Sequence, residues 1–223
     1  TSSEVDFCGH ATVATFATLY QKGVIGVGNY VQRTKAGMLS VKIKSNGQIV
    51  MEQRLPQKLA RISNQDMSDI LGIELELLES TNLPIEVIST GLPDAIIPVP
   101  KGCLDKIKPN DKLISGFCKK HNLVGFHVFE LNDSESEITA SCRNFAPLFG
   151  ISEESATGTS NGALACYLAE HLDLGTDFVF EQGRAMNCTS KITAAVQLQE
   201  ENVIKVEVGG FASSIGTLTV SLS

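Results

Sequence analysis

Two segments of the chain are apolar at almost every position, without the polar face of an ordinary surface helix. The first is ATVATFATLY, residues 11–20, and the second is ALACYLA, residues 163–169. Superposing the two segments places Cys8 on Thr157, Gly9 on Gly158 and Leu19 on Leu168. A helix that is apolar on every side is a buried helix. The pattern predicts an internal repeat in which each half wraps a sheet around its own central helix.

The segments around these two helices predict strands, hairpins and shorter helices. Asn46-Gly47 lies between alternating residues in MLSVKIKSNGQIVMEQRL, which favours a hairpin. SNQDMSDILGI predicts a short helix that is capped near Asn64 or Gln65. The remaining predictions are strands on both sides of a break at residues 91–93, a helix over 105–122, strands over 123–131 and 137–145, a loop, a strand over 177–183 and a hairpin over 191–210. We therefore expect an α/β (α+β) fold with halves at residues 1–95 and 96–223, the last strand returning to the first half.

Composition narrows the class of protein. The 223 residues carry a formal net charge of -7, which argues against a nucleic-acid partner. The six cysteines are widely spaced without a CxxC pair, and no apolar run reaches the roughly 18 residues of a membrane span. The sequence also has no P-loop and no GxGxxG motif after a strand, so neither ATP nor a nicotinamide cofactor is indicated. We expect a soluble cytoplasmic protein with reduced thiols and no cofactor or metal.

Candidate chemistry gathers at the starts of the two apolar helices. The N–H groups of Gly9, His10, Gly158 and Thr159 could hold the oxygens of a carboxylate substrate. Acids precede both helices, namely Glu4 before the first and Glu153 and Glu154 before the second. A partly desolvated carboxylate there could act as base and acid, although capping and dipole stabilisation are the simpler roles. The thiol of Cys8 is the rival base or nucleophile, with a small buried apolar residue as its simpler role.

Several motifs, in order along nearly the whole chain, resemble the PhzF-like phenazine-biosynthesis family. They are EVDFCGHATVAT, STGLPDAIIPV, CRNFAPLFGISEESATGTSNGALACYL, FVFEQG and VEVGGFA. The resemblance implies the diaminopimelate epimerase fold, with two pseudo-symmetric halves and an active site between them. It also implies a homodimer, and further N-terminal strands that this chain lacks. The resemblance therefore implies that this chain is a cofactor-independent isomerase. Such an enzyme moves a proton on a small carboxylate-bearing substrate, here in the cleft between the halves.

The resemblance also assigns roles to individual residues. Glu4 matches the family's proton-shuttling carboxylate, and Glu154 and Thr159 stand where the family usually has Asp and Ser. We take these three as catalytic, and Cys8, Gly9, His10 and Gly158 as substrate-binding. The region VQRTKAGMLSV has no counterpart of the histidine found in the phenazine enzyme, which argues against phenazine synthesis itself.

Two other functions stay open on the sequence. A two-thiol amino-acid racemase or epimerase would use Cys8, but Thr157 stands where the repeat would place the second thiol. A ligand-binding scaffold that has kept the fold and lost the reaction is the other alternative. The remaining histidines, His121, His127 and His171, are expected on the surface or on strands.

Overall fold

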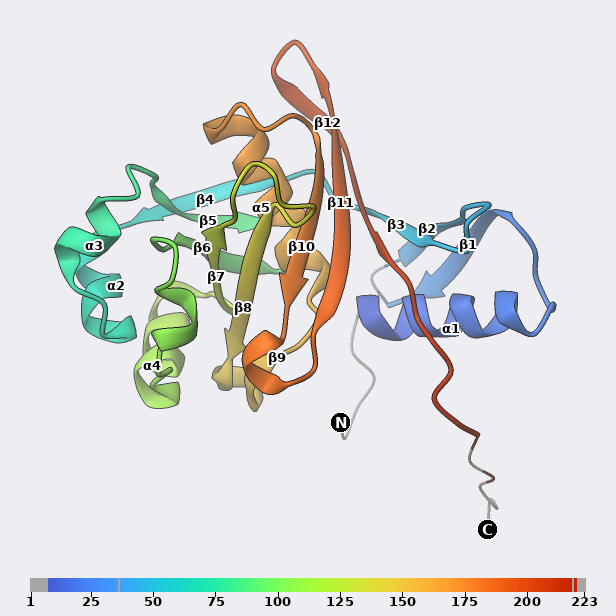
Figure 1. Cartoon of the computed structure of the whole chain (residues 1–223), viewed down its shortest axis with the longest axis horizontal. Coiled ribbons are helices and arrows are strands. Elements are labelled where there is room, and N and C mark those ends of the chain that lie inside the picture. Colours follow the sequence, from blue (N-terminus) through green and yellow to red (C-terminus); the bar gives the residue numbers. More distant parts are fainter. Residues whose placement is uncertain (1–7, 36, 218, 220–223) are drawn as a thin grey trace. The chain divides into compact units, whose positions relative to one another are not determined.

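The computed structural model describes residues 8–35, 37–217 and 219, and its contacts define two compact units (Figure 1). One unit comprises the chain up to residue 51 together with the chain from residue 210, and the other comprises residues 52–209. Residue 95 lies within a strand of the second unit. The division of the chain into family halves at that residue stays a prediction.

The first unit packs one helix on an antiparallel sheet. Its elements are α1 (Gly9–Gln21), β1 (Gly28–Thr34), β2 (Gly37–Ile43) and the start of β3 (Ile49–Gln53). Strands β2 and β3 form the predicted hairpin, in which Gly47 adopts a φ of 82° that suits glycine. Of α1, Thr12 and Ala17 are the buried residues. The prediction of a first helix buried on every side is wrong here, because the strands cover one side of α1.

The second unit contains a mixed sheet whose strand order is β12-β11-β10-β8-β7-β6-β5-β4, with β9 paired to β8. Pairs β6–β7 and β8–β10 are parallel, while the other pairs are antiparallel. The strands are β4 (Gln57–Ile62), β5 (Ile85–Ser89), β6 (Pro93–Pro98), β7 (Gly125–Leu131), β8 (Ala140–Ala146), β9 (Ile151–Glu154), β10 (Asp177–Gln182), β11 (Ser190–Gln199) and β12 (Asn202–Gly210).

Helix α5 (Gly158–His171) is the central helix of this sheet, and Figure 1 shows it behind β10 and β11. It contacts β5, β6, β10 and β11, and every residue from Thr159 to Leu168 is buried. The prediction that the second apolar segment is a buried helix is therefore confirmed over residues 163–168, and Ala169 is partly buried. A separate apolar core joins the sheet to α2 (Asn64–Leu71), α3 (Leu75–Glu79) and α4 (Asp111–His121).

Several element boundaries differ from the sequence prediction. The helix expected from residue 105 is a 3-10 turn, η1 (Leu104–Lys106), followed by α4 from Asp111. Pro109 separates the two, because proline lacks an N–H and disfavours helical backbone in the preceding residue. Helix α2 is capped by Ser63 rather than by Asn64 or Gln65. The expected loop before α5 contains β9, and strands β1 and β4 were not predicted.

Two further 3-10 turns, η2 (Pro147–Phe149) and η3 (Arg184–Met186), connect elements of the second unit. None of the helices in the described part of the chain has the length and apolar character that crossing a membrane would require.

Candidate active site

The start of α5 brings a carboxylate to an uncapped helix end. Thr157 occupies the N-cap position in extended backbone, with φ -128° and ψ 96°, but its side chain does not cap the helix. Its hydroxyl instead donates to Glu154 Oε2 over 2.7 Å. A threonine at this position normally accepts a hydrogen bond from an N–H of the first turn. The first-turn N–H groups of α5 therefore lie next to an acid and have no side-chain cap.

Gln182, the last residue of β10, fixes this arrangement through four hydrogen bonds. Its Nε2 donates to the carbonyl oxygen of Glu154 at 2.7 Å and to Thr157 Oγ1 at 3.0 Å. Its Oε1 accepts from the backbone N–H of Thr157 at 3.2 Å and from Asn161 Nδ2 at 2.8 Å. These bonds use both donors and both lone pairs of the amide, and Gln182 is fully buried. The amide thus connects β9, the N-cap and the first turn of α5.

The glycine after Gln182 is required by a close approach of the chain. Gly183 has a φ of 88°, and a Cβ built on it would lie 2.3 Å from the carbonyl oxygen of Cys188 and 2.8 Å from the Cβ of Ser155. Any other residue at position 183 would displace the segment that presents Gln182.

The two adjacent acids of β9 have different roles, because consecutive residues of a strand point to opposite faces. Glu153 forms a two-pronged ion pair with Arg143, at 2.8 Å from Nε and 2.7 Å from the second guanidinium nitrogen. Arg143 also donates to the carbonyl oxygens of Leu104 and Ile107. Glu153 is therefore a structural residue, and Glu154 is the acid at the start of α5.

A cluster of buried polar side chains surrounds the first turns of α5. Ser160 donates to Asp94 Oδ2, and Asn144 Nδ2 lies 3.2 Å from Ser160 Oγ and 3.3 Å from His127 Nδ1. Burial raises the pKa of Asp94 to about 6, although the Ser160 hydrogen bond opposes the shift. Burial also lowers the pKa of His127 to about 3. At neutral pH the cluster therefore contains a neutral His127, and the Asp94 carboxyl has a pKa much nearer to neutrality than an exposed aspartate has.

At the start of α1 the side chain of the N-cap residue also makes no capping hydrogen bond. Cys8 is its N-cap residue, and Gly9 and His10 open its first turn. The Cys8 sulfur lies 3.5 Å from His10 Nε2. Glu4, the predicted base, lies outside the described residues. The structure thus places Cys8, Gly9 and His10 together at one helix start, and Glu154, Gly158 and Thr159 together at the other.

Thr159 was predicted to be catalytic, but most of its surface is buried. Its exposed fraction is 8%, and its carbonyl oxygen accepts a hydrogen bond of 2.9 Å from Thr90 Oγ1. This bond ties the second residue of α5 to the segment that follows β5.

The buried cysteines are poorly suited to thiolate chemistry. Burial raises the pKa of Cys118 and of Cys166 to about 12 and raises the pKa of Cys142 as well. Cys166 lies well inside α5, and the N-cap of that helix is Thr157. Within residues 8–35, 37–217 and 219, no three His, Cys, Asp or Glu side chains gather as a metal site would require.

Sequence reasoning missed most of the residues that hold Glu154. Gln182 lies within the quoted FVFEQG motif but received no role, and Asn161 and Asn144 were not singled out. His127 is on a strand, as expected, but it is fully buried, and His171 pairs with Glu86 at 2.9 Å. The available signal for His127 was a histidine within GFHVFEL, a run too apolar for a half-exposed strand.

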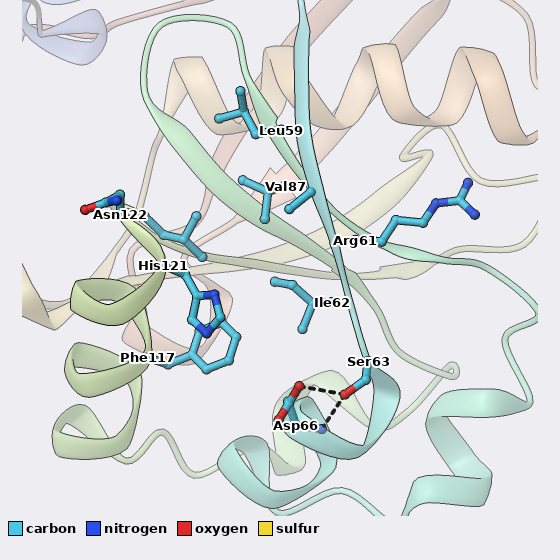
Figure 2. Close-up of a pocket in the computed structure, with 11 residues that line it drawn as sticks. Leu59, Arg61, Ile62, Ser63, Asp66, Val87, Phe117, His121 and Asn122 are labelled. Atoms are coloured by element: carbon cyan, nitrogen blue, oxygen red, sulfur yellow. Dashed lines mark hydrogen bonds between the residues drawn. The ribbon is translucent and has the colours of Figure 1, made fainter.

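A shallow cavity of about 240 Å³ lies elsewhere in the second unit, between β4, α2 and α4 (Figure 2). Several of its side chains already contact other residues. Ser63 and Asp66 bond to each other at the start of α2, His121 stacks on Phe117, and Figure 2 shows Arg61 directed away from that ring pair. None of the predicted site residues lines this cavity. We therefore assign the candidate chemistry to the start of α5.

Comparison with known proteins identifies the family. The family model described as phenazine biosynthesis-like protein, PhzC-PhzF, matches residues 1–216. The chain is 30% identical to an uncharacterized isomerase of Clostridium acetobutylicum, over 95% of this chain and 74% of that protein. It is also 30% identical to the uncharacterized isomerase YddE of Escherichia coli, over 94% of this chain and 73% of that protein.

Solved structures give the same result. The crystal structure of a phenazine biosynthesis protein of the PhzF family from Bacillus anthracis matches with a TM-score of 0.79 and 26% identity, over 93% of this chain and 73% of that one. The mixed α+β fold is therefore the diaminopimelate epimerase-like fold expected from the sequence. The chain belongs to the phenazine biosynthesis-like family, PhzC-PhzF, and is an enzyme of its isomerase class.

Proposed function

We propose that the protein is a cofactor-independent isomerase that moves a proton on a small carboxylate-bearing substrate, with Glu4 as base and acid and Glu154 assisting it. One observation carries the proposal: Thr157 gives its hydroxyl proton to Glu154 instead of capping α5. An acid thus lies beside helix N–H groups that have no side-chain cap. Proton transfer next to a carboxylate needs this combination of a base and donors for the developing negative charge.

The proposed binding groups are backbone N–H groups in the first turns of α5 and α1. Helix α5 has 14 residues, so its N-terminus carries the partial positive charge that favours a carboxylate. We assign substrate oxygens to the N–H groups of Gly158 and Thr159, and likewise to those of Gly9 and His10. These donors would bind the substrate more tightly once negative charge has moved onto its oxygens.

The proposed reaction has two proton transfers and no net oxidation. The base takes a proton from a substrate carbon, and the electron pair of that C–H bond moves toward the carboxylate. The acid form of the same residue then returns a proton to another carbon, or to the other face of the first one. No electrons leave the substrate, so the reaction itself requires no redox cofactor. The homodimer implied by the resemblance is part of the same proposal.

A thiol mechanism has one supporting observation, the contact between Cys8 and His10. It also needs a second thiol on the opposite side of the substrate carbon. Cys166 is a poor candidate, because its thiol is buried inside α5 and burial raises its pKa to about 12. The carboxylate mechanism is therefore the better supported one.

The test is proton NMR in deuterated water with the full chain and a panel of dihydro-hydroxyanthranilate, amino acids and related carboxylates. We expect deuterium to enter one substrate carbon with the wild type and with Cys8→Ala, but not with Glu4→Gln. Exchange lost in Cys8→Ala and retained in Glu4→Gln would indicate the thiol racemase. Binding of a carboxylate without any exchange would indicate a scaffold that has lost the reaction.

A further inference from the structure

The hydrogen bonds around Glu154 have a direction that is fixed by backbone groups. The Thr157 N–H can only donate and the Glu154 carbonyl can only accept, so the oxygen of the Gln182 amide faces the former and its nitrogen faces the latter. The second hydrogen of that nitrogen then points at Thr157 Oγ1. The Thr157 hydroxyl accepts from Gln182, and its own proton goes to Glu154 Oε2.

The hydrogen bonds from Gln182 through Thr157 to Glu154 form a series, and Asn161 extends this series on the side away from Glu154. Its Nδ2 uses both hydrogens, one for Gln182 Oε1 at 2.8 Å and one for the Thr157 carbonyl at 2.9 Å. Its Oδ1 therefore faces the other way. That oxygen is buried and has no hydrogen-bond partner among the residues that the structure describes. A buried acceptor without a partner costs about 1–3 kcal/mol, so a donor is expected there.

His127 is the candidate for that donor, because its electrostatics include Asn161 although no hydrogen bond joins these two described side chains in the structure. Ser160 donates to Asp94, so Asn144 Nδ2 must be the donor to Ser160 Oγ, and the same nitrogen faces His127 Nδ1. His127 Nδ1 is therefore an acceptor, and the proton of the neutral ring lies on Nε2. Nε2 is buried and likewise has no partner in the described chain. Asn161 acts to raise the pKa of His127, as an acceptor oxygen does, against the larger lowering caused by burial.

We propose that His127, Asn161 and Gln182 are positioning residues whose hydrogen bonds run in one direction and commit the Thr157 hydroxyl proton to Glu154. The bonds from Asn161 to Gln182 and from Gln182 to Thr157 are present in the structure. The inferred step is that His127 Nε2–H faces the unpartnered Asn161 Oδ1 and so fixes the direction of both. Glu154 is thereby held as a hydrogen-bond acceptor beside the start of α5. The role rests on the proposed function, because it treats Glu154 as the acid that assists proton transfer.

The series of hydrogen bonds orients the Thr157 hydroxyl and the Glu154 carboxylate, and it does not conduct protons. Two of its members are side-chain amides, which keep their protons under ordinary conditions, and burial keeps His127 neutral. Its effect on the reaction is therefore geometric: it fixes the Glu154 carboxylate relative to the α5 N–H groups. Misplacing a catalytic group by about 1 Å can cost about 100-fold in rate.

The first test reads the direction of the hydrogen bonds without any substrate. In the full chain labelled with 15N at histidine, we expect His127 to carry its proton on Nε2 and to keep that tautomer between about pH 5 and 8. A proton on Nδ1 would overturn the inference and would leave the proposed function untouched.

The second test measures kcat and KM for deuterium exchange into the substrate found above. We expect Thr157→Val and Gln182→Met to lower kcat about 100-fold with little change in KM, and Thr157→Ser to restore it. Tyr167→Phe is the matched control, because it removes another buried α5 hydrogen bond, the 2.6 Å bond to the carbonyl of Pro84. It should lower thermal stability and leave kcat unchanged.

A wild-type kcat in folded Thr157→Val would contradict the positioning role. If the wild type exchanges none of the carboxylates, the proposed function fails and the inferred role fails with it. The histidine spectrum would still decide the direction of the hydrogen bonds.

Discussion

Helices α4 and α5 both begin after a residue that commonly caps helices, but the two side chains are used differently. Asn110 caps α4 by accepting from the N–H of Leu113 at 3.1 Å, and Ser63 caps α2 in the same way. Thr157 makes no such bond and donates to Glu154 instead. A cap contributes about 1 kcal/mol. Helix α5 therefore lacks the stabilising bond that α4 has, and its first turn lies uncapped by Thr157 beside an acid.

The largest expected effect separates the two acids of β9. Glu154→Gln should lower the rate of substrate exchange by about 10²–10⁴, because an amide cannot take up the proton, while the Thr157 hydroxyl can still donate to the amide oxygen. Exchange followed by proton NMR measures this. An undiminished rate would remove Glu154 from the mechanism.

The matched control is Glu153→Gln, which breaks the enclosed pair with Arg143. We expect a loss of about 3 kcal/mol in the free energy of unfolding in urea, since Arg143 then lacks its countercharge. The exchange rate per folded molecule should stay unchanged. A stability loss in Glu154→Gln as large as in Glu153→Gln would mean that the two acids do not differ as we describe.

Asp94→Asn tests the buried side of the α5 start through pH. The folded-state pKa of Asp94 is raised from 3.8 to about 6, chiefly by burial, so the folded state binds this proton more tightly than the unfolded state does. Stability from this group is complete below about pH 4 and is lost as pH rises to about 6. The variant should therefore gain up to about 3 kcal/mol over the wild type at pH 8, and about none at pH 4.

Urea unfolding at several pH values measures that difference. A stability difference between Asp94→Asn and wild type that is the same at pH 4 and pH 8 would show that the Asp94 carboxyl titrates normally.

The smallest expected effect is at α4. Asn110→Ala should lower the free energy of unfolding by about 1 kcal/mol and leave substrate exchange unchanged, because the lost bond is only a helix cap. Thr157→Ala should do the converse, with a larger effect on exchange than on helix capping. If Thr157→Ala lost as much stability as Asn110→Ala and kept the wild-type rate of exchange, the start of α5 would not differ from that of α4 as we describe.

The sequence correctly predicted those elements of the fold that are determined by residues close together along the chain. The Asn46-Gly47 hairpin and the all-apolar helix α5 follow from residues close together in sequence. The burial of α1 was wrongly predicted, because it depends on which strands surround the helix. Strand β4 was missed because five of its six residues are exposed and no alternation marks it.

The residues of the candidate site also fall into those that local sequence predicted and those that it did not. Glu154 was predicted from its place before a helix and from the resemblance, and Thr157 was noticed only as the counterpart of Cys8. Gln182 and His127 reach the site from β10 and β7, and their partners lie far away in sequence. No spacing rule connects such residues, because cross-strand neighbours are set by the register of the sheet. Glu4, predicted as the base, lies outside the described residues.

The two hydrogen bonds that join Glu154 to Gln182 and Thr157 act on different parts of the residue. The Gln182 amide donates to the backbone carbonyl of Glu154, whereas the Thr157 hydroxyl donates to its carboxylate. A substitution at Gln182 therefore disturbs the path of the chain at the end of β9. A substitution at Thr157 removes one bond to the acid and leaves that path in place.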